Sequence, residues 1–203
     1  MLTVLLMRST IGVYVIPSAS MEATLHGCAG CENDRVLVDK VSLWVSPLRP
    51  GEVVVFHGPD GWLGEAGVPA ATGLVAVLEQ VGAVVGITPP GSADFVKRVV
   101  AIGGQTVQCC DSQGRVVVDG SPLEEPYVRL DPRTGQGQQA AFGPVRVPDD
   151  HLWVMGDNRN NSADSRFRGP IPVAEVVGRA RLIVWPVFRW DVIPAPDLRV
   201  DRA

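Results

Sequence analysis

Asp94-Phe95-Val96-Lys97-Arg98-Val99-Val100-Ala101-Ile102 is the stretch that decides the fold, because its apolar residues predict a β-strand. Successive side chains of a strand point to opposite faces. One face is therefore predicted to hold Phe95, Lys97, Val99 and Ala101, with Arg98 on the other. This places Lys97 on an apolar surface, where an amine loses its water and its pKa falls.

Further short apolar runs lie on both sides of this strand. Strands are predicted over residues 11–16, 34–45, 52–56, 106–110, 115–118, 152–155 and 179–187. Within 34–45, Asp39 and Lys40 are expected to mark a turn or an exposed face. The 22 glycines and 17 prolines are spread along the 203 residues, and Asp119-Gly120 is a hairpin signal. Many short strands with frequent turns indicate a mostly β fold.

The β-domain is expected to span residues 13–190 and to include two regions without predicted strands. Residues 57–93 are predicted as an insertion, in which the Ala-, Val- and Gly-rich stretch 68–87 could form a helix. Residues 131–144 are predicted as a loop and 191–203 as a peripheral C-terminal tail.

The first residues are apolar, but they are followed at once by Arg8. Residues 1–7 fall short of the roughly 20 residues that a membrane-spanning helix needs. Residues 1–12 are therefore expected to be the end of an incomplete membrane anchor, with a buried first strand as the alternative.

Charge limits the kinds of partner and of base. The net charge is −4 and no basic block occurs, which argues against nucleic acid as a partner. Only Lys40 and Lys97 among the 18 basic residues are lysines. Arginine does not lose its proton in proteins, so the two lysines are the basic residues that could act as a general base. Lys40 lies next to a predicted strand end and is expected to be solvated.

A second stretch, Ile16-Pro17-Ser18-Ala19-Ser20-Met21, places two hydroxyls two residues apart. In an extended segment Ser18 and Ser20 would point the same way. A serine can be a nucleophile when a base activates it. Taken alone, however, this stretch is more typical of a polar loop after a strand.

The four cysteines occur as Cys28-x-x-Cys31 and as the adjacent pair Cys109-Cys110. Four cysteines allow three disulfide connectivities, and a disulfide would indicate an oxidising compartment. A four-cysteine zinc site is the alternative, but an adjacent pair has the wrong spacing for a zinc knuckle. No metal is expected.

A dense polar run follows the strand at 152–155: Gly156-Asp157-Asn158-Arg159-Asn160-Asn161-Ser162-Ala163-Asp164-Ser165-Arg166. With this run, four segments resemble the motifs of the bacterial type I signal peptidases. Residues 16–25 resemble the nucleophile motif, 51–56 a short strand motif, 95–104 the lysine motif and 156–166 the last motif. They occur in the family's order, and the resemblance covers most of residues 14–185. Gly103-Gly104-Gln105 and the His26-Gly27-Cys28 stretch are most similar to actinobacterial members.

The resemblance implies a signal-peptidase-like antiparallel β-sheet or barrel that carries a Ser/Lys dyad. Ser20 would be the nucleophile and Lys97 the general base, with the Ser18 hydroxyl and the Ser20 N–H facing the oxyanion. Ser162 would orient the Lys97 amine. Support for this loop is expected from Asp157, Asn158, Asp164 and Arg166, and the substrate pocket is expected to be lined by Ile16, Met21, Leu25, Phe95 and Val96. No cofactor is expected.

The resemblance also implies partners and a location. The substrates would be signal peptides of exported preproteins, cut after Ala-x-Ala-like sites, and membrane lipid would be a further partner. The catalytic domain would lie on the extracytoplasmic face of the cell membrane.

Two departures from the family pattern leave the catalytic groups unchanged. Ala23 stands where the family usually has proline, and Gly103-Gly104-Gln105 where many members have Pro-Gly-Asp. One alternative function is a catalytically inactive scaffold that binds at a membrane surface. Another is a self-cleaving Ser/Lys repressor, but no basic helical domain precedes Ser20 in this sequence.

Overall fold

The computed structural model describes residues 10–59, 61–62, 87–88, 94–131 and 137–198, which are mostly β as predicted. The strands are β1 (Ile11–Val15), β2 (Arg35–Asp39), β3 (Val53–His57), β4 (Ile87–Thr88), β5 (Asp94–Ile102), β6 (Thr106–Cys109), β7 (Val116–Val118), β8 (Ser121–Pro122), β9 (Phe142–Arg146), β10 (His151–Met155), β11 (Ile171–Pro172), β12 (Val176–Trp185) and β13 (Asp191–Val192). The short helices are η1 (Ala19–Met21), α2 (Ser42–Val45), α4 (Ser165–Arg168), η3 (Val173–Glu175) and η4 (Val187–Arg189).

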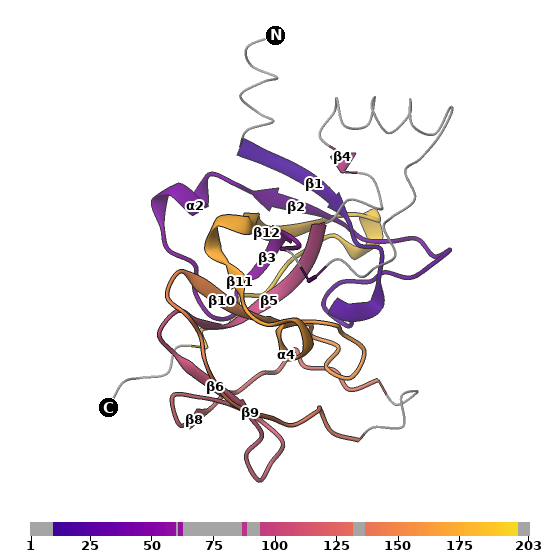
Figure 1. Ribbon diagram of the computed structural model, residues 1–203. Helices are drawn as coiled ribbons and strands as arrows, with labels where there is room; N and C mark the ends of the chain where they lie inside the picture. Colours follow the sequence, from indigo (N-terminus) through magenta and orange to yellow (C-terminus); the bar gives the residue numbers. More distant parts are fainter. Residues whose placement is uncertain (1–9, 60, 63–86, 89–93, 132–136, 199–203) are drawn as a thin grey trace.

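The strands form two sheets, and the larger one curls over the main core (Figure 1). Its order is β11-β10-β5-β3-β12-β2-β1-β4, with β13 paired to β12. The pairs are antiparallel except for β1 with β4. The smaller sheet, in the order β8-β7-β6-β9, lies below it in Figure 1. The predicted class, an antiparallel β-sheet fold, is thus confirmed.

The predicted anchor over residues 1–12 and the predicted insertion over 57–93 lie largely outside the described residues. Within the described part of the chain, no helix is both long and apolar enough to cross a membrane. The proposed domain limits stay a prediction.

β5 follows the predicted alternation in its first half, where it pairs residue for residue with β3. The pairing of β5 with β10 shifts register next to Trp153, which leaves Val100 as an extra, bulged residue. Ala101 therefore packs with Trp153 in a different cluster. The prediction that Ala101 shares a face with Lys97 is wrong for this reason.

Two other predicted boundaries differ from the structure. The segment predicted over 34–45 is a strand only up to Asp39, one of the two residues expected to mark a turn or an exposed face. The chain turns there into α2, and the Ser42 N–H donates to the Asp39 carboxylate. The loop predicted over 131–144 overlaps β9, which begins at Phe142 and pairs with β6. The predicted hairpin is confirmed, since Asp119 and Gly120 both have positive φ between β7 and β8.

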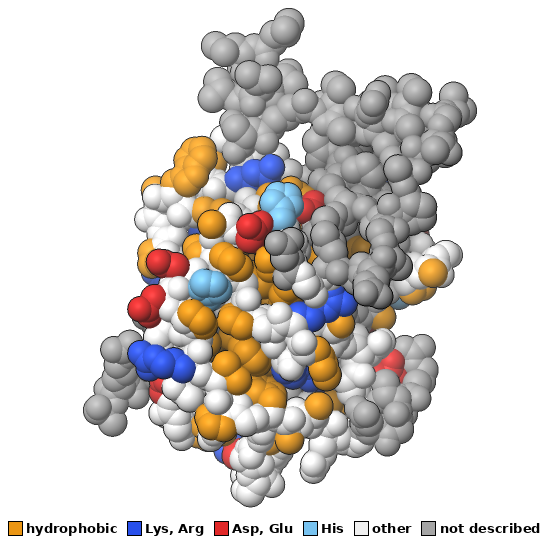
Figure 2. All heavy atoms as spheres, viewed as in Figure 1, with side chains coloured by type: hydrophobic (Ala, Val, Ile, Leu, Met, Phe, Trp, Pro, Cys, Tyr) orange, Lys and Arg blue, Asp and Glu red, His pale blue; other side chains and the backbone are white. Residues whose placement is uncertain are grey.

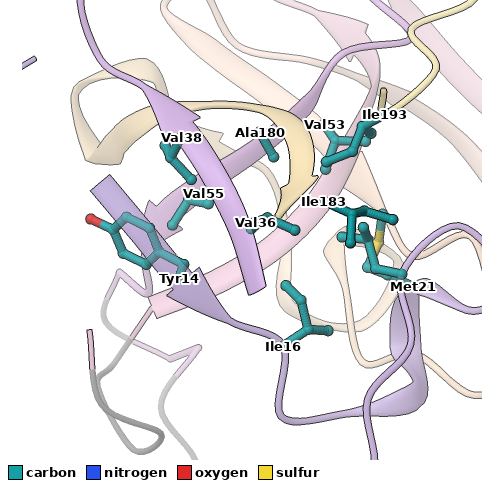
Figure 3. Packing of buried hydrophobic residues seen from close by; sticks show 11 residues of the cluster. Tyr14, Ile16, Met21, Val36, Val38, Val53, Val55, Ala180, Ile183 and Ile193 are labelled. Atoms are coloured by element: carbon teal, nitrogen blue, oxygen red, sulfur yellow. The ribbon is translucent and has the colours of Figure 1, made fainter. Parts of the chain in front are cut away.

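The main core fills the inside of the curled sheet (Figure 3). Its buried members are Tyr14, Ile16, Met21, Leu25, Val36, Val38, Val53, Val55, Ala180, Ile183 and Ile193. Figure 3 shows Ile16 and Met21 reaching into this cluster from the serine segment. The position of the serine segment is therefore tied to the core on both of its sides.

The chain after Trp190 was predicted to be peripheral, which is wrong for residues 191–198. Ile193 belongs to the main core, and Leu198 belongs to the cluster under the smaller sheet.

Large hydrophobic side chains also lie at the surface, among them Trp44, Phe167 and Phe188. Figure 2 shows hydrophobic side chains open to solvent on one face of the molecule.

Candidate active site

The structure brings together the two side chains that were predicted to form a dyad. Ser20 lies in η1, and Lys97 lies in β5. Lys97 Nζ donates to Ser20 Oγ over 2.8 Å and to the Val96 carbonyl over 2.9 Å. Ser18 Oγ donates to Ser20 Oγ over 3.2 Å. Two hydroxyls and one amine thus meet at one point.

The serine segment is extended only in its first part. Ser18 has an extended backbone, with φ −139° and ψ 158°, and the next three residues form the η1 turn. The hydroxyls of Ser18 and Ser20 therefore meet because of this turn and not because both residues lie in one extended strand. Gly27 packs directly against this segment, and a Cβ there would lie 2.8 Å from Ser18 N.

Lys97 is held as a buried amine. Lys97 is only 4% exposed. Burial lowers its pKa to about 8, which the carboxylates of Asp164 and Asp157 partly oppose, while Arg168 and Arg166 lower the pKa further. A lysine in this state supplies an unprotonated amine near neutral pH far more often than a solvated one does.

Arg98, the neighbour of Lys97 on the other face of β5, is fully buried and forms the centre of an ion-pair network. Its guanidinium donates to both oxygens of Asp157, over 2.9 and 2.7 Å. The Tyr127 ring lies 3.9 Å from the Arg98 Cζ. Thr24, from the segment after η1, donates to Asp157 over 2.6 Å. The network therefore joins β5 to the chain that follows the nucleophile.

The polar run after β10 holds the serine segment through its backbone. Asn158 N donates to the Ser20 carbonyl over 3.1 Å, and Asn158 Nδ2 donates to the Ala19 carbonyl over 3.0 Å. Asp164 accepts from Gly156 N over 2.9 Å and from two nitrogens of Arg166, each over 2.8 Å. Asp157, Asn158, Asp164 and Arg166 thus lie beside the serine segment, and their supporting role stays a prediction.

Ser162 does not make the contact that was expected of it. Its buried hydroxyl acts on the Asp164 carboxylate, whose pKa it helps to lower, and the bonds of Lys97 go to Ser20 and Val96. Ser162 Oγ packs closely against Gly156, next to the Ser20 carbonyl. Its role in orienting Lys97 stays a prediction.

The five expected pocket residues divide into two groups. Ile16, Met21 and Leu25 belong to the main core and are at most 2% exposed, so they offer almost no surface to a substrate. Phe95 and Val96 are partly exposed at the start of β5. The sequence motif marks the neighbourhood of the site, but it does not distinguish a side chain that supports the site from one that lines it.

The cysteines take one of the three possible connectivities, Cys28 with Cys31 and Cys109 with Cys110. The His26 ring and the sulfurs of Cys28 and Cys31 lie within 4.8 Å of one another. Because these two sulfurs are bonded to each other, they are not available as thiolate ligands in this state.

Sequence reasoning missed Arg98, Thr24 and Gly27. A signal existed for Arg98, because an arginine inside a strand with apolar residues on both faces needs a buried partner. Nothing local marked Thr24 or Gly27, since their contacts come from segments distant in sequence.

The chain is similar to known proteins over most of its length. The family described as "Signal peptidase, peptidase S26" matches residues 1–185. Signal peptidase I of Mycobacterium tuberculosis (strain CDC 1551 / Oshkosh) is 46% identical, over 93% of this chain and 70% of that protein. The probable signal peptidase I of Mycobacterium leprae (strain TN) is 43% identical, over 87% of this chain and 69% of that protein. Signal peptidase I of Leptolyngbya laminosa is 36% identical, over 89% of this chain and 72% of that protein. The chain therefore belongs to the signal peptidase I family, peptidase S26, and is a serine peptidase.

Proposed function

We propose that this protein removes signal peptides from exported preproteins with a Ser/Lys dyad, in which Ser20 is the nucleophile and Lys97 the general base. The observation that carries the proposal is the 2.8 Å contact between Lys97 Nζ and Ser20 Oγ. Burial lowers the pKa of Lys97 to about 8, so about a tenth of the amines are unprotonated at pH 7. An unprotonated amine within hydrogen-bond reach of a hydroxyl is the arrangement that a general base requires.

In the acylation step, Lys97 Nζ takes the proton of the Ser20 hydroxyl as Oγ attacks the carbonyl carbon of the scissile bond. The negative charge on the carbonyl oxygen is stabilised by the Ser18 hydroxyl and the Ser20 N–H. When the carbon–nitrogen bond breaks, the Lys97 ammonium returns its proton to the leaving amine of the mature protein. The signal peptide remains bound to Ser20 as an ester.

In the deacylation step, a water molecule gives a proton to Lys97 and attacks the ester carbon. The ester bond breaks, Ser20 Oγ recovers a proton from the ammonium, and the signal peptide leaves with a new carboxyl group. The base acts twice and is regenerated, so the cycle needs no further reactant than water.

The start of β5 offers a place for the substrate chain. Arg98 is the first residue of β5 that pairs with β10, so Asp94 to Lys97 have a described strand, β3, on one edge only. An extended peptide could add to the other edge and would then run past the Lys97 amine. Phe95 and Val96 border this edge, which supports a small-residue preference of the Ala-x-Ala type next to the cut.

The substrate class sets the place of the reaction. A signal peptide becomes accessible to a peptidase where its preprotein leaves the cytoplasm. The catalytic domain over 13–190 is therefore proposed to lie on the extracytoplasmic face of the cell membrane. Membrane lipid is the expected second partner. Exposed Trp44 and Val45 on α2 are apolar side chains that fit such a contact.

The proposal is tested with purified protein in detergent and a peptide that contains an Ala-x-Ala site. Ser20→Ala is expected to abolish cleavage, and Lys97→Arg to lower it at least about 100-fold because arginine cannot accept the proton. The matched controls are Ser112→Ala, at an exposed turn, and Lys40→Arg, the other lysine; both should cleave like the wild type.

Three results would contradict the proposal. Full activity of Lys97→Arg would exclude Lys97 as the base, and full activity of Ser20→Ala would exclude Ser20 as the nucleophile. Failure of the folded wild-type protein to cleave any such peptide would favour the inactive scaffold.

A further inference from the structure

The charged groups around Lys97 differ in whether they form ion pairs. Asp164 is paired with Arg166, and Asp157 is paired with Arg98. Each of these pairs is buried; the two carboxylates raise the pKa of Lys97, and Arg166 lowers it. Arg168 also reaches Lys97 electrostatically, but it has no ion pair with a carboxylate of the described residues. One positive charge near the amine is therefore left without an opposite partner there.

Arg168 is held in place by the same loop that supports the site. It ends α4, and its N–H donates to the Asp164 carbonyl over 3.0 Å. Val154 N, in β10, donates to Ser165 Oγ at the start of α4 over 3.0 Å. α4 is therefore bonded at both its first and its last residue.

The Arg168 guanidinium lies against an aromatic wall beside the base. Its Cζ is 5.8 Å from the centre of the Phe95 ring and 5.9 Å from the centre of the Trp62 ring. Phe95 is two residues before Lys97, on the same face of β5. Cation–aromatic contacts of this kind hold a guanidinium without neutralising it.

We infer that Arg168 is a positioning residue for the reaction: its positive charge, fixed against Phe95 and Trp62 without a carboxylate partner among the described residues, favours loss of the proton from Lys97. The consequence for catalysis rests on the proposed function, in which Lys97 is the base. The effect on the charge state of Lys97 does not, and it can be measured without any substrate.

The two-lysine composition makes a direct measurement possible. In Lys40→Arg, Lys97 is the only lysine, so ¹³C-labelled lysine gives a single side-chain signal that can be titrated by NMR. Replacing Arg168 by Gln in this background is expected to raise the apparent pKa of Lys97 by about half a unit. Arg168→Lys keeps the charge and should restore most of the difference; it adds a second lysine signal, which is identified by its absence from the Arg168→Gln spectrum. Since Arg168 is partly exposed, the shift should shrink in 1 M salt.

The matched control is Arg146→Gln, an exposed arginine of the smaller sheet that is absent from the charges acting on Lys97. It should leave the titration unchanged. In the peptide assay, Arg168→Gln should move the acid limb of the kcat/KM profile upward by the same half unit, with the alkaline plateau retained.

Two results would overturn the inference. The first is a Lys97 titration that is the same in Arg168→Gln as in its parent. The second is an Arg168→Lys variant shifted as far as Arg168→Gln, which would indicate a loss of packing and not of charge. If Lys97 titrates as expected but Lys97→Arg still cleaves peptide, the charge effect stands and the proposed function fails.

Discussion

At the scale of single residues, Lys97 is held in a state that opposes folding. In the unfolded chain its amine binds a proton up to a pKa of about 10.4, whereas burial lowers the pKa to about 8 in the folded protein. Between these two values the unfolded state binds more protons, so the free energy of unfolding rises with pH in this window. Below pH 8 the full cost of the buried amine is present.

Replacing Lys97 by Met is therefore expected to abolish activity and to stabilise the protein at pH 7, by about 2 to 3 kcal/mol at most. The gain should decline above pH 8 and be nearly absent at pH 10.4. Urea unfolding at pH 7 and pH 10 measures both values. Lys40→Met, at a partly exposed lysine, is the control for replacing a lysine by methionine away from the site. A Lys97→Met protein that is less stable than the wild type at pH 7 would contradict this account.

The same scale shows what sequence can and cannot predict about the site. Alternation along the strand at 94–102 was enough to place Lys97 on an apolar face and Arg98 on the other. It says nothing about partners, and the contacts of Arg98 with Asp157 and Tyr127 join segments that lie far apart in the chain. The motif likewise grouped Met21 with the site, although this side chain packs into the core.

At the scale of elements, the end of β10 and the η1 turn fit together with almost no free space. A Cβ on Gly156 would lie 2.5 Å from the Ser20 carbonyl and 2.6 Å from the Ser162 Cβ. Neither neighbour can move easily, because the Ser20 carbonyl is also held by Asn158 N. The spacing between Ser20 and Lys97 therefore depends on a glycine at 156.

Gly156→Ala is expected to lower kcat/KM at least about tenfold, since displacement of the nucleophile by a fraction of an ångström weakens the attack geometry. Its fold should persist, because the contact lies at the site and not in a core cluster. Peptide cleavage and a thermal unfolding curve measure the two effects. Gly143→Ala is the matched control in β9, where an added Cβ meets nothing within 4 Å. Equal activity of the two variants would show that the close fit does not position Ser20.

Element boundaries also show where sequence patterns fail. The hairpin at Asp119-Gly120 was predictable, because its turn needs two positive φ angles that these residues tolerate. The bulge at Val100 was not, because it depends on the register that β10 adopts against β5. One extra residue in a strand reverses the faces beyond it, which is why Ala101 lies away from Lys97.

At the scale of the whole molecule, residues 191–198 contact the cores of both sheets, although their composition suggested a peripheral tail. Ile193 N donates to the Arg181 carbonyl over 2.9 Å, and the Pro194 carbonyl accepts from Arg98 Nη1 over 2.6 Å. Ile193 packs into the core of the larger sheet, and Leu198 packs into the cluster beneath the smaller one. A proline-rich stretch without periodicity gives no sign of such contacts, so the sequence predicted a peripheral tail.

Ile193→Ala is expected to destabilise the protein by about 2 to 4 kcal/mol, because it removes buried methyl groups from a core that cannot fully close the space. Leu198→Ala should cost a similar amount through the other cluster. The neighbouring Val192 is 66% exposed, so Val192→Ala is the matched control and should change stability by less than about 0.5 kcal/mol. Urea unfolding of the full chain, followed by tryptophan fluorescence and by far-UV circular dichroism, measures the loss. If the segment joins both sheets, the two signals should move to lower urea together in both core variants. A urea midpoint for Ile193→Ala equal to that of Val192→Ala would show that the segment is peripheral, as its sequence suggested.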